Sequence, residues 1–312
     1  LFLEQLREVM VEPKVYLGVE MYRKGIYDPT IQVAMEKRKE IIEILNKFRE
    51  NPLPQEWYPF SVICENCGKI STTKILSYDE EEKVVEYVCS KEKVLLHKKY
   101  WVEGCGHKGR VSVFGGTGKL VWRVEWPARW YALKVTCEPF GKEHAASGGS
   151  YDTGREICEK IFGWKPPYPV IYEHFTVKGE KMSKSKGNVI TLPMMLRFLA
   201  PEEIRYWMFQ GKLTIAKDIN LERMVPKIVE DFQRAERVYF NLEEEKDERV
   251  RNNLIKAYKL AVVKPSRPRI QVPFSLASLI VQFVDIEKKF ETALEIIEKS
   301  LGIKVKDEDL SL

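Results

Sequence analysis

Several features are scarce or absent in this sequence of 312 residues, and each absence excludes a class of protein. No apolar run approaches the roughly 20 residues of a membrane span, so no membrane partner is expected. No basic stretch followed by an apolar one precedes residue 30, so no secretory leader is expected either. Lysine and arginine exceed the acidic residues by only 51 to 46, and a net charge of +5 does not by itself indicate a nucleic-acid partner.

The composition that is present favours a folded protein with more than one core. Hydrophobic residues make up 44% of the chain and aromatic residues 11%, which excludes a largely disordered protein. One compact core usually needs roughly 150 residues, so about two domains are expected. In the absence of a leader, the six cysteines are expected to be reduced thiols of a cytoplasmic protein, with metal binding as a possible use.

The order of helical and strand-like patterns predicts a mixed α/β chain. Thr30 is expected to cap a helix over 31–50. Alternating runs predict short strands at 83–88 and 110–113. Further expected features are a helix near 153–162, an amphipathic helix over 225–242, a proline-rich linker at 264–273 and a last helix over 284–301.

Four of the cysteines have the spacing of a zinc site. Cys64 and Cys67 lie on one turn followed by glycine, where backbone amides can point at the sulfurs. Zinc takes four such ligands in tetrahedral geometry, so a second pair is needed. We expect Cys89 and Cys105 to supply it, with His107 as the substitute for one of them. A full set of protein ligands leaves no open coordination position, which predicts a structural role for the zinc.

The segment from Lys178 to Asn188 contains four lysines within nine residues, interleaved with small hydroxyl residues and bounded by glycines. Such a segment cannot pack as a core, and it is expected to form a mobile, positive loop suited to a triphosphate. Its literal string Lys181-Met182-Ser183-Lys184-Ser185 resembles the second signature of class I aminoacyl-tRNA synthetases.

Other segments resemble one family of that class, the lysyl-tRNA synthetases found mainly in archaea and some bacteria. They cover most of the chain. The segment 122–130 resembles a tryptophan-rich strand of that family, and the segments 140–144 and 147–151 resemble its nucleotide and amino-acid binding region. The cysteine motif resembles its zinc insertion. The segment 267–274 resembles the start of its anticodon-binding portion.

The resemblance implies an α/β fold: the second half of a Rossmann-like class I synthetase core, with a zinc-ribbon-like insertion and an all-α carboxy-terminal region. The expected segments are a helical continuation of the catalytic domain at 1–59, the zinc-binding insertion at 60–116, the second half of the catalytic domain at 117–191, a helical stem-contact region at 192–268 and the start of a helical anticodon-binding domain at 269–312.

The resemblance also implies a reaction, in which lysine and ATP form lysyl-adenylate and the lysyl group passes to its tRNA. Lys181 and Lys184 are then the expected catalytic cations, because they oppose charge that develops on the phosphates. Mg²⁺ bound to the triphosphate would share that work. The ATP-binding residues expected from the same resemblance are Gly141, Glu143, His144, Lys181, Met182, Ser183, Lys184 and Ser185.

Recognition of lysine requires a surface for an apolar stem and an acid for the ammonium group. Tryptophan faces suit both the stem and the charge. The expected pocket residues are Trp122, Trp126, His144 and Tyr151, with Trp130 as a further candidate and at least one of the tryptophans in the core. Glu125 is a candidate for the acid. Cys137 and Cys158 have no partner at useful spacing and are expected to be small buried side chains.

Two observations leave the interpretation open at specific points. The four histidines, His97, His107, His144 and His174, do not form the His-Ile-Gly-His signature of class I enzymes, so we expect the amino-terminal half of the catalytic domain to be missing and the piece alone to be inactive. A glutamyl or cysteinyl enzyme, or a non-enzymatic RNA-binding paralogue, would share parts of the pattern.

Basic residues are scattered over the helical region after Ser185. They either follow tRNA phosphates or form a solvated helix face. They are Arg197, Arg205, Lys212, Lys217, Arg223 and Lys227.

Overall fold

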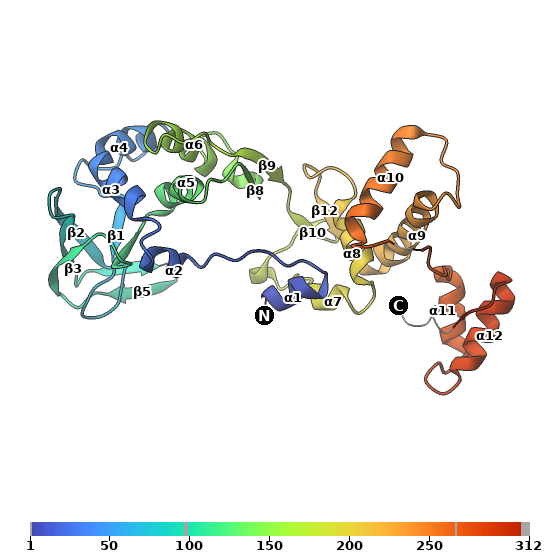
Figure 1. The fold of residues 1–312 in the computed structure, drawn as a ribbon. Helices are drawn as coiled ribbons and strands as arrows, with labels where there is room; N and C mark the ends of the chain where they lie inside the picture. The colour runs from blue at the N-terminus through green and yellow to red at the C-terminus, as the bar shows by residue number, and fades with distance from the viewer. Residues whose placement is uncertain (1, 97–98, 266, 307–312) are drawn as a thin grey trace. The chain divides into compact units, whose positions relative to one another are not determined.

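The computed structural model describes residues 2–96, 99–265 and 267–306. The chain forms two compact units, shown as a ribbon in Figure 1. One unit is Lys14–Tyr172, and the other combines Leu1–Pro13 with Glu173–Leu312. The first unit is therefore inserted into the second along the sequence. None of the helices within the described ranges has both the length and the apolar character that a bilayer crossing requires.

The unit Lys14–Tyr172 begins with helices, continues with short strands and ends in alternating helices and strands. Its elements are α2 (Gly18–Arg23), α3 (Asp28–Glu36), α4 (Arg38–Asn46), β1 (Phe60–Val62), β2 (Thr73–Asp79), β3 (Val84–Cys89), β4 (Lys93–Leu96), β5 (Tyr100–Glu103), β6 (Lys108–Ser112), β7 (Gly118–Leu120), α5 (Trp122–Ala132), β8 (Cys137–Gly141), η1 (Lys142–His144), α6 (Ser150–Lys160) and β9 (Tyr168–Tyr172).

The helix expected over 31–50 is two helices, α3 and α4, with a break at Lys37. Thr30 lies inside α3, which begins at Asp28, so the expected cap is wrong. The break has a physical reason at the next residue: the Arg38 guanidinium donates to the carbonyls of Gln55 and Trp57 and lies 4.7 Å from the Tyr58 ring centroid. In one continuous helix, Arg38 would lie on the same apolar face as Ile31 and Met35, which would bring its charge toward the core.

The strands of this unit form small sheets. The strands expected at 83–88 and 110–113 correspond to β3 and β6, which pair antiparallel with each other in the sheet β2–β3–β6. Strands β1 and β7 pair antiparallel, β4 and β5 form a hairpin, and β8 and β9 pair parallel with Phe140 opposite Ile171. The helix α6, expected near 153–162, connects β8 to β9 and gives the strand–helix–strand order of an α/β fold.

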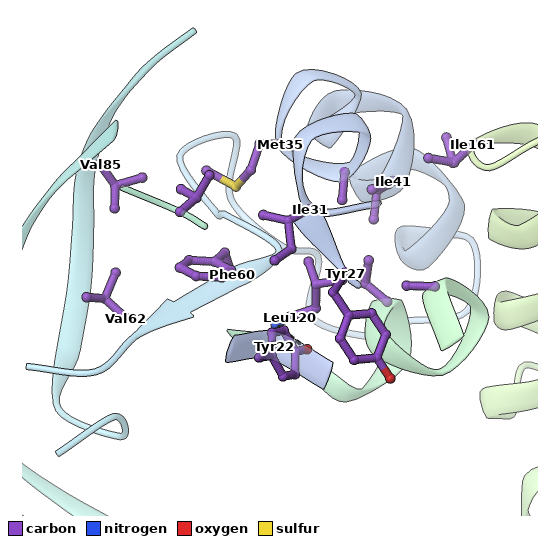
Figure 2. Close-up of a cluster of buried hydrophobic side chains, with 14 of the residues drawn as sticks. Tyr22, Tyr27, Ile31, Met35, Ile41, Phe60, Val62, Val85, Leu120 and Ile161 are labelled. Atoms are coloured by element: carbon purple, nitrogen blue, oxygen red, sulfur yellow. Dashed lines mark hydrogen bonds between the residues drawn. The ribbon is translucent and has the colours of Figure 1, made fainter. Parts of the chain in front are cut away.

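One apolar core joins the helices of this unit to its antiparallel strands. Figure 2 shows Ile31 of α3 toward Phe60 of β1, with Val62 of β1 and Val85 of β3 beyond Phe60 and Ile41 of α4 on the other side of Ile31. All five side chains are buried. The strand β3, which ends at Cys89, is therefore packed against the same core as α3 and α4, and the two regions depend on each other for stability.

The segment 122–130, expected as a strand, is the helix α5, so that expectation is wrong. Trp122, Trp126 and Trp130 recur at every fourth residue, which is a helical spacing that places all three on one face. Pro127 lies inside the helix. Of the two unpartnered cysteines, Cys158 is buried as expected, but Cys137 is exposed at the start of β8.

The other unit is mostly helical within its described residues. Its elements are α1 (Phe2–Glu8), β10 (Phe175–Val177), β11 (Glu180–Lys181), η2 (Lys184–Lys186), α7 (Leu192–Met195), α8 (Pro201–Phe209), β12 (Lys217–Ile219), α9 (Leu221–Tyr239), α10 (Glu248–Ala261), α11 (Phe274–Phe283) and α12 (Phe290–Leu301). The helix expected over 225–242 is α9, which starts earlier because the Asn220 side chain caps it. The last helix begins at Phe290 rather than 284, because a turn at Asp285 precedes it.

Arg205 of α8 ties the first residues of the chain to the end of α10. Its guanidinium donates to the carbonyls of Val9 at 3.1 Å and Met10 at 3.2 Å, and also to those of Leu260 and Ala261. The Val9 side chain is buried with residues of α7, α8 and α9. These contacts place the amino-terminal residues in this unit.

The described residues of the expected linker, 264–265 and 267–273, form no helix or strand, but the linker is fixed to α9 by a buried carboxylate. Glu236 is 1% exposed and accepts hydrogen bonds from Tyr258 at 2.7 Å, Gln271 at 2.8 Å and the Arg269 side chain at 3.2 Å. A buried carboxylate needs such partners to remain charged. The linker is thus held in place before α11 begins.

Candidate functional site

The four cysteines Cys64, Cys67, Cys89 and Cys105 come together in the unit Lys14–Tyr172. Their sulfur atoms all lie within 4.8 Å of one another. The Cys64–Cys105 distance is 3.6 Å and the Cys67–Cys89 distance is 3.7 Å. A tetrahedron with zinc–sulfur bonds of about 2.3 Å has sulfur–sulfur edges of about 3.8 Å. The donor set and its spacing therefore fit a tetrahedral metal ion.

Backbone turns hold the sulfurs in this arrangement. Gly68 donates to the Cys64 carbonyl at 2.8 Å and has a φ of +69°, which favours glycine at the end of the turn. The Cys105 amide points at the Cys89 sulfur at 3.4 Å. The side chain of Asn66 and the His107 amide lower the pKa of the Cys105 thiol to about 6, so that it is largely a thiolate at neutral pH.

His107, the expected substitute ligand, does not belong to this group of four. Its Nε2 lies 4.0 Å from the Glu65 carboxylate, and its ring lies 6.1 Å from that of Tyr87. The Tyr87 hydroxyl in turn donates to Glu65 at 3.2 Å. These contacts place His107 beside the cluster, where it supports the turn that carries Cys64. His97 lies outside the described residues.

A second group of side chains surrounds the tryptophan face of α5. Trp122 is 45% exposed and stacks on Trp126, with 5.3 Å between ring centroids. The His144 ring lies 6.1 Å from Trp122 and 5.5 Å from Trp126. Trp126 and Trp130 are buried, so only Trp122 presents an open ring face. The expectation that at least one tryptophan belongs to the core is confirmed.

Polar groups beside these rings differ in what they already bind. The Tyr151 hydroxyl donates to the Pro167 carbonyl at 2.8 Å. The Glu125 carboxylate is buried and pairs with Arg129 at 3.0 Å and Lys119 at 3.8 Å. Glu138 of β8 accepts a hydrogen bond from the Trp126 indole at 2.8 Å. Glu138 therefore lies at the tryptophan group, whereas the charge of Glu125 is already balanced by two cations.

The segment Gly141–His144 follows β8 directly, at the carboxyl end of a parallel strand. A Cβ at Gly141 would lie 2.5 Å from the end of the Glu143 side chain, so a larger residue at this position would have to displace that carboxylate. The same geometry makes the carboxylate of Glu143 lie close to the backbone. Ligands of open α/β sheets bind at this end of the strands.

In the other unit, the lysine-serine segment starts as a tight hairpin. Strands β10 and β11 pair antiparallel, with Val177 opposite Glu180. The two residues between them, Lys178 and Gly179, have φ values of +51° and +81°, as a two-residue type I′ turn requires. Asp218 of β12 accepts hydrogen bonds from Thr176 and from the Gly179 amide, each at 2.7 Å. The loop predicted from the sequence is therefore anchored at its first turn.

Asn188 holds the signature residues that follow. Its Oδ1 accepts a hydrogen bond from the Ser183 amide at 2.8 Å, and its Nδ2 donates to the Lys181 carbonyl at 3.2 Å. The Lys181 ammonium lies 3.0 Å from His174 Nε2, and Lys184 is exposed in η2. The Ser185 side chain lies outside the described part of the structure. The fold thus presents Lys181 and Lys184 from a short segment with a fixed backbone.

Comparison with known proteins decides the family. Residues 1–263 match the family described as tRNA synthetases class I (K). The chain belongs to the class I lysyl-tRNA synthetase family. Relatives named Lysine--tRNA ligase include those of Methanocaldococcus jannaschii, 39% identical over 94% of this chain and 54% of its own length, Archaeoglobus fulgidus, 36% identical over 98% and 55%, and Methanosarcina barkeri, 45% identical over 68% and 37%.

The chain spans about half the length of the class I lysyl-tRNA synthetases that it matches over nearly all of its residues. Membership of this family confirms the α/β class expected from the sequence. The cysteine cluster is also in the matched residues, and its four sulfur donors agree with the metal site expected from the spacing.

Two residues of this class I lysyl-tRNA synthetase chain, Glu138 and Asn188, are recognised as part of the site from the structure and were not expected from the sequence. Glu138 lies in β8, the element after the helix that carries the tryptophans, and no local sequence pattern connects it to them. Asn188 is the last residue of the lysine-serine segment, and the preference of asparagine for short side-chain-to-backbone hydrogen bonds is a signal that sequence reasoning could have used.

Proposed function

We propose that this chain forms the part of a lysine–tRNA ligase that carries the lysine-serine signature and the lysine side-chain pocket. The reaction would be the ATP-dependent formation of lysyl-adenylate followed by transfer to tRNA. The observation that carries the proposal is the fixed hairpin of Lys181–Ser183, within a chain of this family. The relatives' name, Lysine--tRNA ligase, supports the choice of lysine.

In the first step the lysine carboxylate attacks the α-phosphate of ATP, and pyrophosphate leaves. No general base is needed, since the carboxylate is already ionised at neutral pH. Negative charge grows on the leaving pyrophosphate, and Lys181 and Lys184 would oppose it. A cation that is held before the reaction starts is more effective than a flexible one, and the hydrogen bonds of Asn188 on both sides of Met182 supply this order. Mg²⁺ bound to ATP would add positive charge at the phosphates.

The segment Gly141–His144 would bind the ribose of ATP. The Glu143 carboxylate is suited to accept hydrogen bonds from ribose hydroxyls, and the missing side chain at Gly141 allows the nucleotide to approach the backbone. His144 would separate this position from the tryptophans, because its ring contacts Trp122 and Trp126.

The substrate lysine would lie against the open face of Trp122. The stem would contact the ring, and the ammonium group would gain from the ring's negative face. Glu138 would balance the charge, because its carboxylate already contacts the Trp126 indole and, unlike Glu125, makes no ion pair with a cation in the described residues. Tyr151 would act by packing against Phe140, since its hydroxyl is bound to Pro167.

The four cysteines would hold one zinc ion in a zinc-ribbon-like insertion. The sulfur–sulfur distances of 3.6 and 3.7 Å support this assignment. Zinc would supply folding free energy to the turns that carry the cysteines, in addition to the apolar core behind them. The helical region after Leu192 would contact tRNA and begin the anticodon-binding part, and the enzyme would act in the cytoplasm.

Amino-acid-dependent pyrophosphate exchange by the full-length protein, with tRNA present and each amino acid in turn, tests the proposal. Exchange with lysine alone is the expected result. Exchange with glutamate or cysteine would replace lysine as the substrate, and no exchange with any amino acid by a folded, RNA-binding protein would indicate a non-enzymatic relative.

A further inference from the structure

A cavity of about 600 Å³ lies between the carboxyl end of α8, the turn after it and one face of α10. Three cations line it: Lys212 from the turn, and Arg249 and Lys256 from α10. No acidic residue is among the described residues that line the cavity. Arg249 and Lys256 are seven residues apart, which places them on the same face of the helix with Asn253 between them.

These cations differ from the other basic residues of the same helical unit. Arg205 is used up by four backbone carbonyls, and the Lys217 ammonium donates to the carbonyls of Trp207 at 2.9 Å and Gln210 at 2.6 Å. Lys227 pairs with Asp231 at 3.4 Å. Half of the basic scatter seen in the sequence is therefore structural or paired.

Lys212, Arg249 and Lys256, by contrast, are exposed and make no ion pair with any acid in the described ranges. Like charges gathered around one cavity repel one another. Their arrangement is more favourable when an anion lies between them.

The floor of the cavity adds a second independent feature. Tyr206 is fully buried there, and its hydroxyl has no hydrogen-bond partner at standard geometry among the described residues. Burial raises the pKa of Tyr206 to about 12, so the hydroxyl remains a donor at neutral pH. Phe209 at the rim is 45% exposed and offers a ring on which a base or ribose can stack. An aromatic face beside three cations matches the base and the phosphates of a nucleotide.

We infer that this cavity binds the phosphate backbone of RNA, with Lys212, Arg249 and Lys256 contacting successive phosphates and Phe209 contacting an adjoining ribose or base. The inference deepens the proposed function, on which it rests for the identity of the RNA as tRNA. The rise between Arg249 and Lys256 along α10 is about 10 Å. A single free phosphate cannot span that distance, whereas neighbouring phosphates of one strand can.

The test uses the full-length protein and a fluorescent tRNA transcript, without lysine or ATP. The variant replaces Lys212, Arg249 and Lys256 by glutamine. The matched control replaces Lys227, Lys246 and Arg251 by glutamine, which removes the same charge from the same helical region; Arg251 lies on the other side of α10 from Arg249. The dissociation constant is measured by fluorescence anisotropy at several salt concentrations.

Each lost phosphate contact should lower the slope of log affinity against log salt by about one. We therefore expect the cavity variant to lose about two to three from this slope. An exposed ion pair is worth about threefold in affinity, so the loss of three should weaken binding roughly 30-fold. The control should change the slope by less than one. Equal losses in the two variants would overturn the inference, because the effect would then come from net charge alone.

Two further arms keep the result unambiguous. The single variant Lys212→Gln, at an exposed turn, should lower the slope by about one and is not expected to disturb folding. Inorganic phosphate and AMP, added at constant ionic strength, should displace tRNA only at high concentration; tight binding of either one with unchanged tRNA affinity in the variants would assign the cavity to a free ligand instead. Because no step requires lysine activation, failure of the proposed reaction and failure of this site give different results.

Discussion

The cysteine cluster and the lysine-serine hairpin are both short, signature-bearing segments, but they are held in opposite ways. The cysteines lie at turns whose strands pack into a buried core, and two of them are themselves buried. Lys181 and Lys184 lie on an exposed segment, in β11 and η2, whose backbone is held by a few hydrogen bonds to the side chains of Asp218 and Asn188. The cysteine cluster therefore contributes to the stability of the fold, whereas the lysine-serine segment leaves its cations accessible from solvent.

This difference teaches how each site should respond to damage. If the four cysteines hold zinc as proposed, removal of one of them should weaken binding of the ion and so reduce the folding free energy that the ion supplies. Removal of one cation from the hairpin leaves the backbone in place and affects only the charge that the cation opposes. Stability should therefore follow the cysteines, and the reaction rate should follow the lysines.

The largest effect is expected from Cys64→Ser. Structural zinc supplies roughly 10–16 kcal/mol in isolated zinc-binding domains, so loss of the ion should unfold β2, β3 and β6 locally. Hydrogen exchange should then become fast in residues 60–113 while the hairpin at 175–188 keeps its protection. The exposed Cys137→Ser is the control and should retain one zinc. A Cys64 variant with a full equivalent of zinc and unchanged exchange would contradict the assignment.

Lys184→Ala should act on rate alone. Loss of one contact to developing charge costs on the order of 3–4 kcal/mol, or a hundredfold to a thousandfold in adenylation, with little change in the KM for lysine. Rapid-quench measurement of adenylate formation by the full-length protein checks this. Lys178→Asn is the matched control, since asparagine tolerates the positive φ of +51°. An unchanged rate in the Lys184 variant would remove this residue from the reaction.

The aromatic group provides an intermediate case, because Glu138 contacts the buried Trp126 and is also proposed to pair with the ammonium group of the substrate. In Glu138→Gln the amide oxygen can still accept from the Trp126 indole, but the charge is lost. Hydrogen bonds to charged groups are worth about 1.5–3 kcal/mol, so the KM for lysine should rise at least tenfold while the melting temperature stays within a few degrees. A lower melting temperature with an unchanged KM would make Glu138 a purely structural residue.

The smallest effect is expected at Asn188. Asn188→Ala removes two hydrogen bonds at an exposed segment, which together are worth about 1–2 kcal/mol. Adenylation should slow about tenfold without loss of thermal stability. Asn188→Asp, which keeps the acceptor for the Ser183 amide, should recover part of the rate. If both variants match the unchanged protein, the segment is positioned by other contacts.

The parts of the site that sequence reasoning predicted are those whose residues carry their chemistry in local spacing. Cys64 and Cys67 share one turn, and the second pair followed from what zinc requires. The helix α5 was misjudged because the tryptophans were compared with a strand, although their spacing of four is helical. Glu138 could not be assigned, since the contact between β8 and α5 depends on packing.

The least predictable parts of the fold are contacts between distant segments. The parallel pairing of β10 with β12 joins residues about forty positions apart through Thr176 and Asp218. The break between α3 and α4 depends on Arg38 reaching the carbonyl of Trp57. The local sequence around a residue does not reveal such a distant partner, because many arginines in similar local sequences make no contact of this kind.

The four carbonyls bound by Arg205 have a consequence for the order of folding on the ribosome. Val9 is synthesised 196 positions before the arginine that binds its carbonyl. Translation proceeds at about 5–20 residues per second, so the segment around Val9 waits roughly ten seconds or more for its partner, while the inserted unit Lys14–Tyr172 is completed in between. A chaperone that recognises short apolar segments would find the Val9 side chain available during that interval and buried afterwards.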